Sequence, residues 1–181
     1  MFSGTRAPLH EGDPPGPQSV YGRTKLAGEE AVLAEHPQAA VARVSLVLGR
    51  GHGPRGSASE AIAWSLAAGQ STLLFEDEYR TPTDPASVAD AVVRLLERGC
   101  AGRFHLGGPE RLSRHELGRR VARLLGLSEA FIVRGRQADR AGPEPRPADV
   151  SLDSDHARLA LGWEPRPLDE ALRESRRSPP S

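Results

Sequence analysis

The sequence predicts an α/β protein whose sheet is mostly parallel. Short apolar runs rich in Val, Leu and Phe alternate along the chain with longer segments of helical periodicity. Such alternation is typical of βαβ units, in which a helix connects two parallel strands. A chain of 181 residues can bury one sizeable core, or a main lobe and a small one.

The first quarter of the chain predicts a loop, a helix and a strand. Residues 1–18 are rich in Pro and Gly, which favours a loop. A helix is expected from Ser19 to Glu35, ending before Pro37. The run from Ala40 to Leu48 has few polar residues, so we expect a strand buried on both faces.

The middle of the chain predicts two further helices with clear boundary signals. An amphipathic helix is expected from Ser57 to Ala68, with Gly69 closing it and a short strand from Ser71 to Phe75 after it. Asp84 is suited to cap the next helix, and Pro85 is suited to its first position. That helix should end at Gly99 and bury one apolar stripe, made of Val88, Val92, Leu95 and Leu96.

The last third of the chain contains a capping-box pattern. Ser113 and Glu116 have the required spacing, and the helix that they open should run to Leu125 with Gly126 at its end. The other expected elements are strands at 103–106 and 131–133, a polar loop at 134–149, an extended stretch at 150–152, helices at 153–162 and 168–176, and a disordered tail at 178–181.

Composition narrows the class of partner and the compartment. With 24 acidic and 24 basic residues the net charge is zero, which offers no electrostatic argument for binding nucleic acid or an anionic membrane. Cys100 is the only cysteine, so neither an internal disulfide framework nor a cysteine zinc cluster is expected. The sequence has no apolar run of 18 residues and no signal-peptide pattern, so we expect a cytoplasmic protein.

One pair of rare residues has the spacing of a proton-transfer site. Lys25 is the only lysine, and Tyr21, one of two tyrosines, lies four residues before it. Residues four apart share one face of a helix. An ammonium about 6 Å from a phenolate stabilises it by roughly 3 kcal/mol at an effective dielectric near 20. The pair would then favour proton donation to an alkoxide. On spacing alone, an ordinary helix surface explains the pair better, because the pattern is short.

The residues around this pair extend the pattern over the whole chain. YGRTKLAGEE, preceded by FSGTRAPLHEGDPPGP, resembles the segment with the motif YGxSKxxGE in extended short-chain dehydrogenases/reductases. AVARVSLVLG, EYRTPTDPASVADAVVRLL, GRFHLGGPERLS and PRPADVSLDSDHARLALGWEP resemble the segments that follow it in that superfamily. Within the superfamily the chain is most similar to the dTDP-4-dehydrorhamnose reductase-like branch.

The resemblance implies roles for individual residues. Tyr21 would be the catalytic acid/base, and Lys25 would support it and hydrogen-bond the ribose of an NADPH or NADH cofactor. Arg43 would lie at the cofactor. The expected substrate contacts, to a nucleotide sugar, are Arg80, Tyr79 and Arg146, and arginine forks suit a diphosphate. For Arg80 and Arg146, surface ion pairs are the alternative.

The resemblance also implies how the chain is divided. Residues 1–56 would be the last part of an incomplete NAD(P)-binding Rossmann-like sheet, whose N-terminal glycine-rich half is missing from this sequence. Residues 57–177 would be mostly a small α/β substrate-binding lobe with returning segments. We therefore expect a truncated reductase that transfers hydride to a sugar carbonyl.

A second glycine pattern offers an alternative cofactor site. Gly51, Gly53 and Gly56 fit GxGxxG between a strand and a helix, with Glu76 and Asp77 about twenty residues further on. Pro54 removes one backbone donor from such a phosphate cradle, which counts against this interpretation.

The histidines and tryptophans give weaker signals, and the sequence allows functions other than a reductase. His105 is expected to be packed or hydrogen-bonded rather than catalytic, His52 and His115 have no partner at metal-ligand spacing, and Trp64 and Trp163 should pack in or near the core. The alternatives to a reductase are a non-catalytic regulatory subunit resembling the methionine adenosyltransferase β subunit, an epimerase fragment, or a broken fragment. A homo-oligomer or a partner enzyme is compatible with each functional alternative.

Overall fold

The computed structural model describes residues 2–4, 7–50, 56–139 and 146–173. The predicted α/β class is confirmed, but the strands form three separate two-stranded sheets. β1 (Ala40–Val44) pairs in parallel with β4 (Gly102–Leu106), and β2 (Thr72–Phe75) pairs in parallel with β6 (Ile132–Gly135). The third pair is antiparallel and joins β3 (Tyr79–Arg80) to β5 (Leu112–Ser113).

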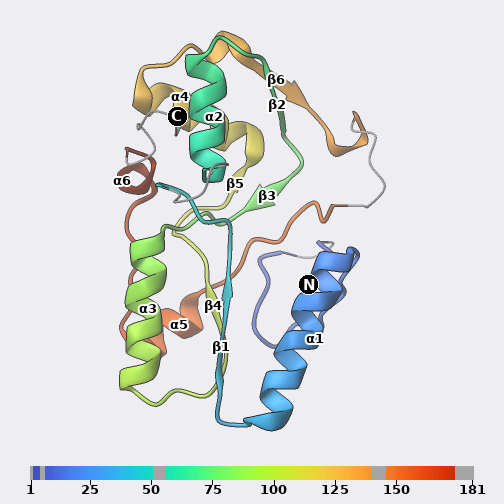
Figure 1. Cartoon of the computed structure of the whole chain (residues 1–181), viewed down its shortest axis with the longest axis vertical. Helices are drawn as coiled ribbons and strands as arrows, with labels where there is room; N and C mark the ends of the chain where they lie inside the picture. Colours follow the sequence, from blue (N-terminus) through green and yellow to red (C-terminus); the bar gives the residue numbers. More distant parts are fainter. Residues whose placement is uncertain (1, 5–6, 51–55, 140–145, 174–181) are drawn as a thin grey trace.

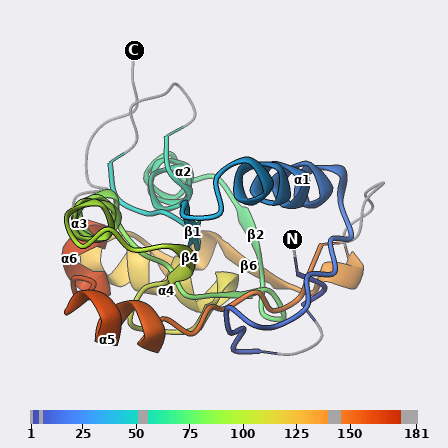
Figure 2. The same cartoon turned by 90° about the horizontal axis from the view of Figure 1, so that it is seen from below.

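These pairs and their helices form two lobes (Figure 1). One lobe holds β1, β4, α1 (Val20–Glu35), α3 (Pro85–Glu97) and α5 (Asp155–Leu161), and Figure 2 shows α1 and α5 on opposite sides of the β1–β4 pair. The other lobe holds β2, β6, α2 (Ala58–Ala67), α4 (Arg114–Leu125) and α6 (Leu168–Arg173). The chain therefore leaves the first lobe after β1, returns to it for α3 and β4, and returns again for α5.

Each lobe has its own apolar core. In the lobe of α2 and α4 the buried side chains include Ile62, Leu66, Leu74, Leu117, Val121, Leu125, Leu168 and Leu172. In the lobe of β1 and β4 they are Ala91, Leu95, Phe104, Leu106, Ala157, Leu161 and Trp163. A small third cluster, Phe2, Leu9 and Leu152, attaches the N-terminal loop to the segment before α5.

The predicted helix boundaries are confirmed where they depend on local hydrogen bonds. The hydroxyl groups of Ser57 and Ser113 accept bonds from the backbone three residues on, and each forms a complete capping box. Asp84 caps α3 with Pro85 at the first position, and Gly126 ends α4 in the left-handed conformation with φ of 68°. Such signals are short-range, and so they can be found in sequence.

Two burial predictions were wrong. β1 is not buried on both faces, since Val44 is 39% exposed; within the described residues β1 has a strand partner on one edge only. The stripe on α3 was also misassigned, because Leu96 is 77% exposed and Val92 is exposed too. The buried line includes Ala91 instead, because α3 turns that side towards α5 and β1.

The remaining expectations differ in smaller ways. The expected strand at 131–133 lies at Ile132–Gly135, and the polar loop after it contains a short 3-10 helix at Gln137–Asp139. Residues 1–18 hold no helix in their described part and form one isolated bridge, from Leu9 to Leu152. The tail at 178–181 lies outside the described residues. None of the described helices has the length and apolar character needed to cross a bilayer.

Candidate functional site

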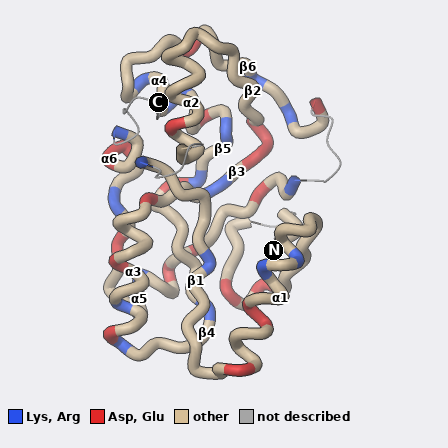
Figure 3. The backbone as a smooth tube through the Cα atoms, viewed as in Figure 1, with Lys and Arg blue, Asp and Glu red and all other residues tan. Residues whose placement is uncertain are grey.

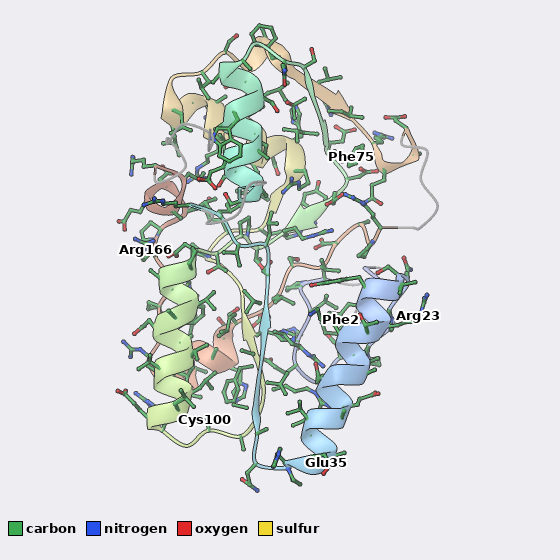
Figure 4. The ribbon with its side chains drawn as sticks, in the orientation of Figure 1. Phe2, Arg23, Glu35, Phe75, Cys100 and Arg166 are labelled. Carbon is green, nitrogen blue, oxygen red and sulfur yellow. The ribbon has the colours of Figure 1, made fainter. Side chains whose placement is uncertain are left out.

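The candidate site is a cavity of about 830 Å³ between α1 and the exposed side of β1. Five of the six site residues expected from sequence line it, and they come from α1, β1, β3 and the segment that starts at Arg146. These are Tyr21, Lys25, Arg43, Arg80 and Arg146. Figure 4 shows Phe2, another lining residue, between α1 and β1.

Tyr21 and Lys25 lie on the same face of α1, as their spacing predicted. The Lys25 ammonium lies 5.4 Å from the centre of the Tyr21 ring, and within the described residues it has no carboxylate partner. Tyr21 is 71% exposed, so water screens the pair. In water an attraction over that distance is worth only about 0.8 kcal/mol. The pair therefore needs a bound ligand or partner that excludes water before it can polarise a proton strongly.

Arg43 is held in a buried ion network. Its Nε and Nη2 donate to the Glu29 carboxylate at 2.9 and 2.6 Å, and Arg103 donates to the same carboxylate. Burial alone would raise the pKa of Glu29, but hydrogen bonds and charge from Arg43 and Arg103 lower it overall. The Arg43 guanidinium thus links β1 to α1 through a buried ion pair, which the sequence did not predict.

His105 extends this network to the N-terminal loop. Its Nε2 lies 3.2 Å from Nη1 of Arg43, and its Nδ1 lies 2.9 Å from the carbonyl oxygen of Leu9. A guanidinium can only donate, so Nε2 must accept, and Nδ1 must carry the proton and donate to Leu9. Burial lowers the pKa of His105 despite the nearby Glu11 carboxylate. His105 is therefore the packed, hydrogen-bonded histidine that sequence predicted.

The residues expected at the substrate divide between two faces. Arg80 donates to the carbonyl oxygens of Tyr79 and Pro147 at 2.6 and 3.4 Å, and to Glu78 at 3.2 Å. Burial lowers the pKa of the Arg80 guanidinium. Arg146 lies with it at the cavity, whereas Tyr79 lies outside the cavity lining, with the Arg111 guanidinium 3.7 Å from its ring centre. The structure thus brings Arg80 and Arg146 together and separates them from Tyr79.

The alternative glycine pattern is only partly visible. Gly51 and Gly53 lie outside the described residues. Gly56 has a positive φ, and a Cβ there would lie 2.5 Å from Trp64, so the glycine is required by packing. The two acidic residues of the pattern have other partners. Glu76 forms ion pairs with Arg134 and Arg136, and the Asp77 carboxylate accepts a hydrogen bond from the backbone N–H of Gln137.

Sequence reasoning missed several residues at the site. Glu29 belongs to the quoted GEE stretch, and its four-residue spacing from Lys25 could have indicated a shared face. Glu78 also lines the cavity and gave no comparable signal, because its place there depends on the pairing of β3 with β5. In the described parts of the chain no group of three or more His, Cys, Asp or Glu side chains could hold a metal ion.

Curated relatives match the chain over part of their length. A probable low-salt glycan biosynthesis reductase of Haloferax volcanii is 32% identical, covering 90% of this chain and 55% of its own. The dTDP-4-dehydrorhamnose reductase of Mycobacterium tuberculosis is 34% identical, and the match covers 84% of this chain and 50% of the reductase. Methionine adenosyltransferase 2 subunit beta of Danio rerio is 27% identical, and the match covers 97% of this chain and 56% of that subunit. The chain thus spans about half the length of these relatives.

Solved structures also match the chain over part of their length. A hypothetical dTDP-4-dehydrorhamnose reductase from Sulfolobus tokodaii has 28% identity and a TM-score of 0.78, covering 90% of this chain and 55% of its own. MoeE5 in complex with UDP-glucose and NAD has 25% identity and a TM-score of 0.76, and the match covers 96% of this chain and 60% of MoeE5. A Bacillus anthracis dTDP-4-dehydrorhamnose reductase in complex with NADP has a TM-score of 0.85 at 18% identity. The match covers 95% of this chain and 60% of the reductase, and at that identity it shows the fold alone.

A family model gives the most extensive match. The model of the RmlD substrate binding domain covers residues 1–178, nearly the whole chain. That extent agrees with the α/β fold and with the motifs around the Tyr21–Lys25 pair. The chain belongs to the RmlD substrate binding domain family.

Proposed function

We propose that this chain is part of an NAD(P)-dependent reductase that acts on the carbonyl group of a nucleotide sugar. The observation that carries the proposal is that Tyr21 and Lys25 line the same cavity as Arg80 and Arg146. The cavity therefore offers a proton donor beside a cation, and it also offers guanidinium groups. A sugar carbonyl joined to a diphosphate needs both kinds of group.

In the proposed reaction Tyr21 donates its phenolic proton to the oxygen of the sugar carbonyl as negative charge develops there. The Lys25 ammonium stabilises the resulting phenolate and is free to hydrogen-bond a ribose hydroxyl. A reduced nicotinamide, when bound, supplies the hydride to the carbonyl carbon. Lys25 fits that ribose because it lines the cavity without a carboxylate partner among the described residues. NADPH and NADH remain equal candidates.

The other residues expected at the site have different proposed roles. Arg146 is proposed as a diphosphate contact, whereas the Arg80 guanidinium donates to the carbonyl oxygens of Tyr79 and Pro147. Arg43 is proposed as a positioning residue, since its guanidinium binds Glu29 and His105. Contact between Tyr79 and substrate, and the division at residue 56, remain predictions. The single cysteine, Cys100, favours a cytoplasmic location.

The test is oxidation of NADPH with dTDP-4-dehydrorhamnose, followed at 340 nm on the complete reductase that contains this chain. Tyr21→Phe should lower the rate at least 100-fold, because proton donation contributes about that much or more. Arg23→Gln is the matched control, because Arg23 is exposed on the same helix and lies outside the cavity lining (Figure 4). Equal rates for Tyr21→Phe and wild type would refute the mechanism.

A non-catalytic subunit is the second candidate function. It is favoured by the similarity to methionine adenosyltransferase 2 subunit beta and by the exposure of Tyr21. This candidate predicts no NADPH oxidation and a stable complex with a partner enzyme. Size-exclusion chromatography of the chain with a purified methionine adenosyltransferase would detect that complex, and reductase activity in an isolated monomer would exclude it.

A further inference from the structure

His105 joins three segments of the chain inside the lobe of β1 and β4. It is paired with Arg43 in the β1–β4 register, and it is fully buried. Its Nε2 lies 3.2 Å from Nη1 of Arg43, and its Nδ1 lies 2.9 Å from the carbonyl oxygen of Leu9. That carbonyl oxygen also accepts the backbone N–H of Asp153 at 2.8 Å. One imidazole ring therefore links β4 to β1 and to the N-terminal loop.

Packing holds the imidazole ring in this orientation. Phe2 lies edge-on against it, with ring centroids 5.8 Å apart and an interplanar angle of 80°. The Arg43 guanidinium in turn lies 5.1 Å from the centre of the Phe2 ring. The backbone N–H of His105 donates to the Glu11 carboxylate at 2.8 Å, which ties this residue to the N-terminal loop a second time. The surroundings thus fit one neutral tautomer, with the proton on Nδ1.

The charges around His105 decide which protonation state is favoured. Burial lowers the pKa of His105 and so does the Arg43 charge, and together they outweigh Glu11, which acts in the opposite direction. The Asp153 carboxylate lies 3.9 Å from His10 instead. The charged or titratable side chains on the elements packed around the ring are Arg43 on β1, Glu29 behind it on α1, Arg103 on β4, Glu11 on the N-terminal loop, and His156 on α5, which lies 3.7 Å from Glu11.

We propose that neutral His105 is a positioning residue for the proton donor Tyr21, and that protonation of His105 slows the reaction. Neutral Nε2 accepts from Arg43 and leaves Nε and Nη2 of that guanidinium to Glu29. A solvent proton on Nε2 turns the acceptor into a donor and places a second cation beside the first. Arg43 then moves away from the imidazolium, and α1 loses its anchor eight residues after Tyr21. This inference rests on the proposed function for the reaction that Tyr21 performs.

The effect should fall on kcat rather than on KM for the nucleotide sugar. Tyr21 and Lys25 lie on α1 and move with it, whereas Arg146 reaches the cavity from another segment. Misplacing a reacting group by about 1 Å can cost about 100-fold in rate. Because burial lowers the pKa of His105, the loss of kcat should begin below about pH 6.5.

The test is a pH–rate profile, from about pH 5 to about pH 8, of the complete reductase that contains this chain. His105→Gln keeps an acceptor at the place of Nε2 but takes up no proton. Its kcat should stay within about threefold of wild type at about pH 7.5, without the loss in acid. His105→Asn keeps a donor at the place of Nδ1 but leaves Arg43 without its acceptor. Its kcat should fall about 10-fold or more at every pH, with KM unchanged.

The matched control is the same substitution at another histidine, His36→Gln. His36 is exposed at the C-terminal end of α1 and lies outside the cavity lining. It should keep the wild-type profile, including the loss of kcat in acid.

Hydrogen exchange measures the docking of α1 without using activity. In the wild-type reductase the protection of the α1 amides, corrected for intrinsic exchange, should fall at least several-fold from about pH 7.5 to about pH 5.5. The protection of the α4 amides should stay constant. In His105→Gln the protection of α1 should not depend on pH.

Three results would overturn the role of His105. These are a wild-type loss of kcat in acid that persists in His105→Gln, a wild-type kcat in His105→Asn, or protection of α1 that is independent of pH in the wild type. Should a substituted protein fail to fold, the exchange measurement on the wild type decides. A protein without reductase activity whose α1 protection still depends on pH would refute the proposed function and leave this role intact. An active reductase with constant α1 protection would do the reverse.

Discussion

Replacing Glu29 with Gln should strongly destabilise the protein. Glu29 is 5% exposed and holds the guanidinium of Arg43, whose side chain is 7% exposed, by two charged hydrogen bonds. Removing one partner of a buried ion pair costs about 3–5 kcal/mol, because the other charge is left uncompensated. The glutamine amide can still accept one bond, and Arg103 is 41% exposed and can turn to water. We therefore expect a loss of about 3 kcal/mol.

The assay is urea unfolding with a thermal melt on the same samples. A loss of about 3 kcal/mol should lower the melting temperature by roughly 6–12 °C in a chain of this length. Asp90→Asn is the matched control, since Asp90 forms an i,i+4 pair with Arg94 and both side chains are over a third exposed. It should change stability by less than about 1 kcal/mol. Equal small losses in both variants would refute the reasoning.

The pH dependence of the same variants provides an independent check. The folded-state pKa of Glu29 lies below its ordinary value, so its contribution is present above the unfolded pKa of about 4.3 and is lost as pH falls through the folded pKa. Wild-type protein should therefore lose stability below about pH 4 more steeply than Glu29→Gln does. Parallel curves for the two proteins would contradict an ionised Glu29 in the native state.

Three other changes have definite expected outcomes. Asp84→Asn should cost about 2–4 kcal/mol in urea unfolding, because Asp84 is 1% exposed, caps α3 and pairs with Arg166 at 2.5 Å. Figure 4 shows Arg166 beside the start of α3. Gly108→Ala should cost at least about 2 kcal/mol, because a Cβ there would lie 1.6 Å from the carbonyl oxygen of Pro82. Gly28→Ala should instead stabilise by about 0.5–1 kcal/mol, since Gly28 is helical and a Cβ there meets nothing within 4 Å; a loss of stability would contradict that.

Sequence could predict the features that depend on near neighbours in the chain. Ser57 and Asp84 cap their helices through bonds that reach two or three residues, so residue type and spacing determine them. The shared face of Tyr21 and Lys25 follows from helix geometry in the same way. These predictions need no knowledge of how the lobes pack.

The features that sequence could not predict depend on packing between distant segments. Arg43 lies 14 residues from Glu29, and only the docking of α1 against β1 brings them together. Acidic and basic residues are interspersed along the chain, so charge order alone does not select this pair (Figure 3). For Tyr79 and Arg80 the alternation of a strand already implied opposite faces. Which face borders the cavity depends on the pairing with β5 and on the segment that starts at Arg146.

The position of the Tyr21–Lys25 pair depends on an anchor on the same helix. Glu29 follows Lys25 by four residues and Tyr21 by eight, so about 12 Å of helix separates the phenol from the buried ion network. A helix is stiff over that length, so the anchor fixes how Tyr21 lies over the cavity. Arg114 lies in the other lobe and, in the part of the chain that the structure describes, shares no hydrogen-bond or ion-pair partner with Glu29. Their substitutions should therefore combine additively in stability, and strong coupling would show that the two lobes do not behave as separate packing units.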